Sequence, residues 1–168
     1  MMELNDFRKQ LDLATQCIPR KHPDAIRALS KEYTHSISLR CNPNIMDSTS
    51  DCFLFVFEEY VPEQLVGKIS AFSQKASEKS NVFQVLLDNG FIELHDERKA
   101  DDKIVAYFDK GTVTHFGKIQ NDKILSKWGV GLIWEHPVFE VPSSYGNEVK
   151  YSSGRPEVEV LEKLLSGS

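Results

Sequence analysis

The stretch that decides the fold is residues 103–129, which read KIVAYFDKGTVTHFGKIQNDKILSKWG. Its first part, Ile104 to Phe108, is rich in the β-branched and aromatic residues that favour a pleated strand. Polar turn residues follow at Asp109 to Gly111 and again at Gln120 to Lys123. Because such short turns join neighbouring antiparallel strands, the stretch predicts a three-stranded antiparallel meander.

His115 lies in the middle of the second predicted strand. Side chains alternate between the two faces of a strand, so one face should carry His115, Gly117 and Ile119. The other face should carry Thr114, Phe116 and Lys118, and in the third strand one face should carry Ile124, Ser126 and Trp128. A histidine that is followed two residues later by a glycine, which removes side-chain bulk beside it, could have its imidazole at the edge of a cleft. The alternative is a structural histidine, partly buried and bonded to the backbone.

The composition is that of an ordinary globular protein. The chain has 168 residues, 40% hydrophobic and 27% charged, which suits one domain. The net charge of −5 and the lack of a basic stripe argue against nucleic acid or an anionic membrane as partners. No apolar run spans a bilayer, and the start MMELNDFRKQ is unlike a signal peptide. We therefore expect a cytoplasmic protein, with thiols at Cys17, Cys41 and Cys52.

Apolar residues at helical spacing predict an amino-terminal cover of two helices within residues 1–48. The first helix carries Leu4, Phe7, Leu11, Ala14 and Ile18 and ends at Pro19, and the second opens at His22-Pro23-Asp24. A core is expected over residues 50–152, with further strands at Phe91 to Leu94 and Glu148 to Ser152. A last helix is expected over residues 155–168, starting near Pro156.

Cys52 stands where a buried helix is expected to start. Ser50 and Asp51 are residues that cap helix N-termini, and the apolar run FLFVF follows at once. A helix that is apolar on every side must be surrounded by protein. The positive end of its dipole would favour the thiolate form of Cys52. The alternative is a core helix or central strand that carries an inert buried thiol.

The order of these elements resembles the NlpC-type and CHAP-type cysteine peptidases and amidases of the papain-like superfamily. The resemblance rests on Asp51-Cys52 at the start of a buried helix, then Lys103 to Phe108, then Thr114-His115-Phe116-Gly117, and it covers residues 50 to about 151. The ending, with Ser126 to Gly129, His136 and Ser144-Tyr145-Gly146, is similar to a group of uncharacterised bacterial domains. The resemblance implies an α+β papain-like fold, with the amino-terminal helices packed on an antiparallel sheet.

The resemblance also implies a thiol-dependent hydrolase or acyltransferase acting on an amide, peptide or related acyl bond. Cys52 would be the nucleophile and His115 the base, and Ser126 or His136 would orient His115. Lys127 and Glu135 are further candidates for the orienting position. The superfamily commonly carries His, Asn, Asp or Glu there, and serine orients the imidazole more weakly than a carboxylate does. No metal or organic cofactor is implied. The alternative function is a catalytically inactive domain of this fold that binds a protein partner, as in toxin and immunity or phage-conflict systems.

Overall fold

The computed structural model of the chain describes residues 2–40, 52–57, 87, 92–128, 131–154, 159 and 162. The helical elements are α1 (Met2–Thr15), η1 (Pro19–Lys21), α2 (His22–Leu29), α3 (Cys52–Phe57) and η2 (Ser143–Tyr145). The strands are β1 (Ser38–Leu39), β2 (Ile104–Asp109), β3 (Thr112–Gln120), β4 (Lys123–Lys127), β5 (Ile133–His136) and β6 (Glu148–Ser152). The described strands form a six-stranded antiparallel sheet in the order β1-β5-β4-β3-β2-β6. The predicted α+β class is confirmed.

The meander β2-β3-β4 forms because its two turns have the geometry that tight hairpins require. Lys110 and Gly111 adopt φ of 50° and 78°, and Asn121 and Asp122 adopt 47° and 64°. Two successive positive φ values make a turn whose twist matches that of the flanking strands. A bulge between Tyr107 and Phe108 then shifts the register of the first hairpin.

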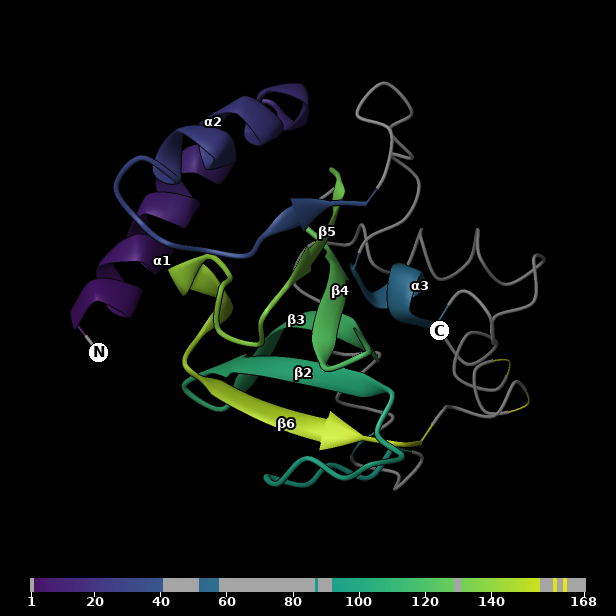
Figure 1. The fold of residues 1–168 in the computed structure, drawn as a ribbon. Helices are drawn as coiled ribbons and strands as arrows, with labels where there is room; N and C mark the ends of the chain where they lie inside the picture. The colour runs from purple at the N-terminus through teal and green to yellow at the C-terminus, as the bar shows by residue number, and fades with distance from the viewer. Residues whose placement is uncertain are drawn as a thin grey trace.

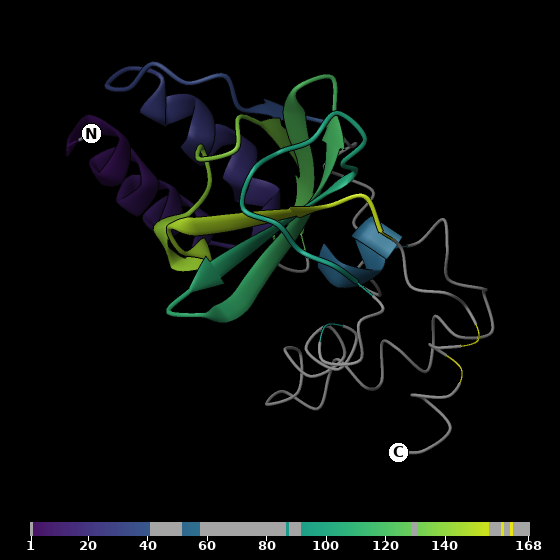
Figure 2. The same ribbon diagram turned by 90° about the horizontal axis from the view of Figure 1, so that it is seen from below.

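The sheet carries a different helical layer on each face (Figures 1 and 2). We call the face against α1 and α2 the cover face, and the opposite face the α3 face. On the cover face, Phe7, Leu11 and Ile26 form one hydrophobic core with residues of the sheet and the segment after it, namely Val105, Tyr107, Ile119, Ile124, Trp128 and Trp134. The α3 face joins the buried residues Phe53 to Phe57 to Ile104, Ala106, Phe108 and Phe116. These two cores reproduce the predicted alternation of side chains along β2, β4 and the part of β3 from His115 onward. The bulge opposite Tyr107 and Phe108 places Val113 on the α3 face, which alternation from His115 does not predict.

Two polar residues one turn apart on α1 attach that helix to the segment before β6. The buried Arg8 donates to Val141 O at 3.1 Å, to Asn147 Oδ1 at 2.6 Å and to Gly146 O. Asp12 accepts from the Ser144 N–H at 3.1 Å and from the hydroxyl groups of Ser143 and Ser144. Burial lowers the pKa of Arg8, and the charges of Tyr107 and Asp12 oppose that shift.

The predicted elements have different outcomes. The two amino-terminal helices, the helix starting at Cys52 and the strand Glu148–Ser152 are confirmed, but α1 ends at Thr15, before the predicted end at Pro19. The strand expected at Phe91 to Leu94 is wrong for Ile92 to Leu94, which are irregular. The helix expected over 155–168 lies outside the described residues, except for Glu159 and Glu162, which are helical. In the described part of the chain, no helix is both long and apolar enough to cross a membrane.

Candidate functional site

Cys52 is the first residue of α3, as predicted. It is half-buried and packs against the aromatic core of the α3 face. The next five residues are all buried, so the whole helix is enclosed by apolar side chains. The proposed caps Ser50 and Asp51 lie outside the described residues, as does Cys41.

His115 lies near the middle of β3, on the cover face. Its cross-strand neighbour is Tyr107, with ring centroids 5.6 Å apart. The Tyr145 ring stacks on the imidazole, with centroids 3.9 Å apart and planes 14° apart. The side chain is 1% exposed, and its Nε2 has no hydrogen-bond partner among the described residues. Burial holds the pKa of His115 well below its ordinary value, and the neighbouring His136 lowers it further.

The sheet therefore separates Cys52 from His115. Phe116, the residue after His115, packs on the opposite face, with its ring 6.0 Å from that of Phe53 in α3. Lys118 lies on that same face, with Nζ 4.8 Å from the Phe55 ring. Because neighbouring residues of a strand point to opposite faces, His115 faces away from α3. The expectation that Cys52 and His115 meet is wrong for this structure, and His115 cannot take a proton from the Cys52 thiol here.

The structure brings Ser126 and His136 together instead. Ser126 Oγ and His136 Nε2 are 2.7 Å apart, and both side chains are fully buried on the cover face. His136 Nδ1 lies 2.8 Å from Pro137 O, which can only accept, so Nδ1 carries the proton. Nε2 must then accept from the Ser126 hydroxyl. Trp128 Nε1 completes the chain by donating to Ser126 Oγ at 2.9 Å.

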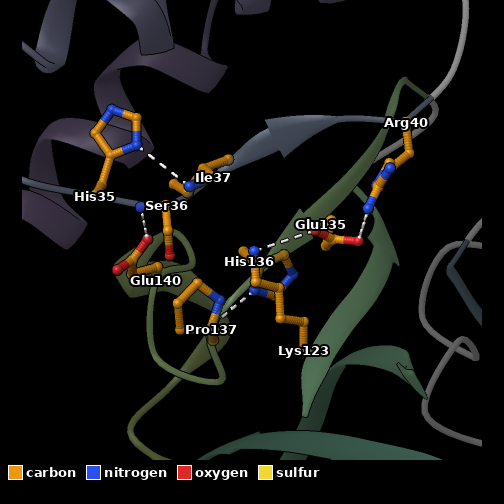
Figure 3. Close-up of polar contacts among 9 residues, drawn as sticks. All are labelled: His35, Ser36, Ile37, Arg40, Lys123, Glu135, His136, Pro137 and Glu140. Carbon is orange, nitrogen blue, oxygen red and sulfur yellow. Dashed lines mark hydrogen bonds and ion pairs between the residues drawn. The ribbon is translucent and has the colours of Figure 1, made fainter. Parts of the chain in front are cut away.

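The other residues considered for orienting His115 do not do so. Ser126 and His136 form hydrogen bonds with each other and with Trp128 and Pro137, and none of these bonds reaches His115. Glu135 forms ion pairs with Arg40 and with Lys123, the latter at 3.2 Å (Figure 3). These partners, Arg40 first, lower the pKa of Glu135. Lys127 is buried and pairs with Ile133, which packs on the α3 face.

His136 is a neutral imidazole at neutral pH. Burial lowers its pKa from 6.5 to about 4, against the smaller raising effects of the Pro137 carbonyl and the Glu135 charge. A serine that donates to a neutral histidine is the arrangement of an activated nucleophile. Here, however, both groups are at 0% exposure and the serine oxygen also receives the Trp128 N–H. No substrate atom can reach this hydroxyl without displacement of the cover.

An open pocket of ≈ 420 Å³ lies at the molecular surface, beside the start of α1. Its lining residues are Glu3, Leu4, Phe7, Tyr33, Thr34 and Glu140. Sequence reasoning missed this site, because its residues come from three separate segments and form no motif. Among the described residues, no three His, Cys, Asp or Glu side chains gather as metal ligands would.

Comparison with protein-family models, curated proteins and solved structures found no match for this chain.

Proposed function

We propose that this chain is a binding domain for a protein partner and that it carries no Cys-His hydrolase site. The observation that supports the proposal is the position of the sheet between Cys52 and His115. A thiol hydrolase needs its base within hydrogen-bond reach of the sulfur. In this structure the imidazole instead stacks on Tyr145, on the other face.

The part of the papain-like resemblance that supports this proposal is the order of the elements along the chain. A helix that starts with cysteine precedes an antiparallel meander that carries a histidine. In an inactive relative, loss of contact between these two residues would leave the scaffold available for recognition. The partner would be a protein, as in toxin and immunity or phage-conflict systems.

Recognition must use side chains other than the two tryptophans. Trp and Tyr side chains are frequent anchors at protein interfaces, and the sequence carries tryptophans at Trp128 and Trp134. Trp128 and Trp134 are each only 2% exposed and pack against each other, with centroids 5.4 Å apart. They belong to the core of the cover face. The open pocket beside α1 is therefore the better candidate for the recognition surface.

The test compares wild type with Cys52→Ala and His115→Ala, with folding checked by circular dichroism. Each protein is exposed to a peptidyl chloromethyl ketone and to a panel of amide, peptide and thioester substrates. We expect no turnover in any of them, and no labelling of Cys52 that depends on His115. Immobilised wild type and Cys52→Ala should recover the same partner from a lysate of the source cells. Labelling or turnover that wild type shows and both variants lose would overturn the proposal. Cys17→Ala, which removes a different thiol, is the matched control.

A further inference from the structure

The open pocket beside α1 has an aromatic floor. The Phe7 ring contacts two other rings, with its centroid 5.3 Å from that of Tyr33 and 5.3 Å from that of His35. The His35 plane is 15° from that of Phe7, so these two rings are stacked. His35 is itself held by the Ser30 hydroxyl at 2.8 Å and the Ile37 N–H at 3.3 Å. The floor of the pocket is therefore built before any ligand arrives.

Carboxylates surround this floor. Tyr33 donates its hydroxyl to Asp6, and this bond, with burial and the charges of Asp6, Glu32 and Glu3, raises the pKa of Tyr33 to about 12. Across the pocket, Glu140 Oε2 accepts the Ser36 N–H at 2.8 Å (Figure 3). That bond fixes one carboxylate oxygen of Glu140 and leaves the other to meet a ligand.

Among the residues that the structure describes, Glu3, Asp6, Glu32 and Glu140 form no ion pair with a basic side chain. Other acids do form ion pairs, among them Asp24, Asp96, Asp102, Asp122, Glu135 and Glu148. Lys9 is the basic residue that lines the adjoining surface hollow, with Glu3, Asn5 and Asp6. The pocket therefore presents carboxylates that have no ion-pair partner among the described residues, beside the rings of Phe7 and Tyr33.

From this combination we propose that the pocket binds an arginine or lysine side chain of a basic peptide segment on the protein partner. A guanidinium or ammonium group gains from the face of an aromatic ring and from hydrogen bonds to carboxylates. Leu4, which is 39% exposed and lines the pocket, would contact the aliphatic stem of that side chain. This inference rests on the proposed binding function and names the chemistry of its partner.

The probe is Nα-acetyl-arginine amide, titrated into the full ¹⁵N-labelled chain and followed by amide chemical shifts. We expect millimolar binding, with shifts confined to Glu3 to Lys9, Tyr33 to Ile37 and the region of Glu140. Nα-acetyl-citrulline amide, which has the same shape without the charge, should leave these signals unchanged. Glu3→Gln with Glu140→Gln removes both charges but keeps the oxygen that accepts from Ser36, and it should weaken binding about tenfold or more.

The matched control is Glu93→Gln with Glu97→Gln, which removes two charges from exposed residues that do not line the pocket. The control should bind as wild type does. Equal weakening in both double variants, or equal binding of citrulline amide, would overturn the site. The site would also be overturned if spermidine or Mg²⁺ produced these shifts while arginine amide did not. A self-dimer that dissociates in the variant Glu3→Gln with Glu140→Gln would overturn it as well.

The two proposals fail differently. If arginine amide does not bind while wild type and Cys52→Ala recover the same partner, the pocket assignment is wrong and the binding function stands. If Cys52 is labelled in a manner that needs His115, the binding function itself is wrong.

Discussion

Ser126 donates its hydroxyl proton to Nε2 of His136 across 2.7 Å, in a part of the core where neither side chain is exposed. The bond joins β4 to β5, and Trp128 adds a donor to the same oxygen. Each polar side-chain atom in this series of hydrogen bonds, which runs from Trp128 Nε1 through Ser126 and His136 to the Pro137 carbonyl, has a partner. Such a network holds two strands in register and is costly to interrupt.

Ser126→Ala should therefore destabilise the fold. It leaves His136 Nε2 and Trp128 Nε1 buried without partners, and each unsatisfied group costs about 1–3 kcal/mol. We expect a loss of about 2–4 kcal/mol in the free energy of unfolding, measured by urea denaturation. Ser153→Ala, at an exposed position, is the control and should change stability little. Equal stability of Ser126→Ala and wild type would show that the network contributes nothing.

Stability should fall as the pH is lowered from 6.5 to about 4. The pKa of His136 is about 4 in the folded chain and near 6.5 when unfolded. Between these values the unfolded state binds more protons, so acid favours unfolding. The difference between these two pKa values corresponds to a loss of about 3 kcal/mol in stability for His136. His115, whose pKa is also lowered, adds to this loss.

The measurement is urea denaturation at several pH values, with His136→Gln beside wild type. This variant lacks the titrating group, so its stability should fall less steeply between pH 6.5 and 4. If the two proteins lose stability in parallel, protonation of His136 is not the cause.

Gly117→Ala should strain the cover face. An added Cβ would lie 2.3 Å from Ile124 Cγ2 and 3.3 Å from Ser126 Cβ. Overpacking of this kind costs about 1–3 kcal/mol. Leucine lacks the Cγ2 branch, so Gly117→Ala should cost less in an Ile124→Leu background. A double-mutant cycle by urea denaturation tests this, and strict additivity would refute the contact.

Arg8→Ala should loosen the attachment of α1. The segment at Val141, Gly146 and Asn147 would lose its buried donors, at a cost of about 3 kcal/mol. Hydrogen exchange should rise in residues 141–147. Arg27→Ala is the control, because its ion pair with Asp24 is exposed and contributes at most about 0.5 kcal/mol. Unchanged exchange in 141–147 would count against the role of Arg8.

The alkylation rate of Cys52 should not depend on His115. The two residues lie on opposite faces of the sheet, so the imidazole cannot activate the thiol. Iodoacetamide should label Cys52 at the same rate in wild type and in His115→Phe, which fills the space with an aromatic ring. The rates are read by mass spectrometry at about pH 6.5, near the ordinary pKa of histidine. A several-fold slower rate in the variant would contradict the structure.

The meander could be predicted from sequence because its determinants are local. The alternation along Ile104 to Phe108, His115 to Ile119 and Ile124 to Trp128 predicts which residues share a face, and the turn residues set the strand pairing. The start of α3 at Cys52 follows equally from neighbouring residues. The pocket carboxylates Glu3 and Glu140 are far apart in the sequence and carry no such local signal.

The amino-acid sequence by itself thus determined the helices, the hairpins and the two faces of the meander. Only the tertiary structure decided which face α3 covers. Phe53 to Phe57 are all buried, so α3 has no polar stripe that would specify its orientation. An apolar helix of this kind can pack on either face of a sheet, and the choice depends on contacts between distant segments. That choice placed Cys52 and His115 on opposite faces, and it left β5 to bring His136 to Ser126.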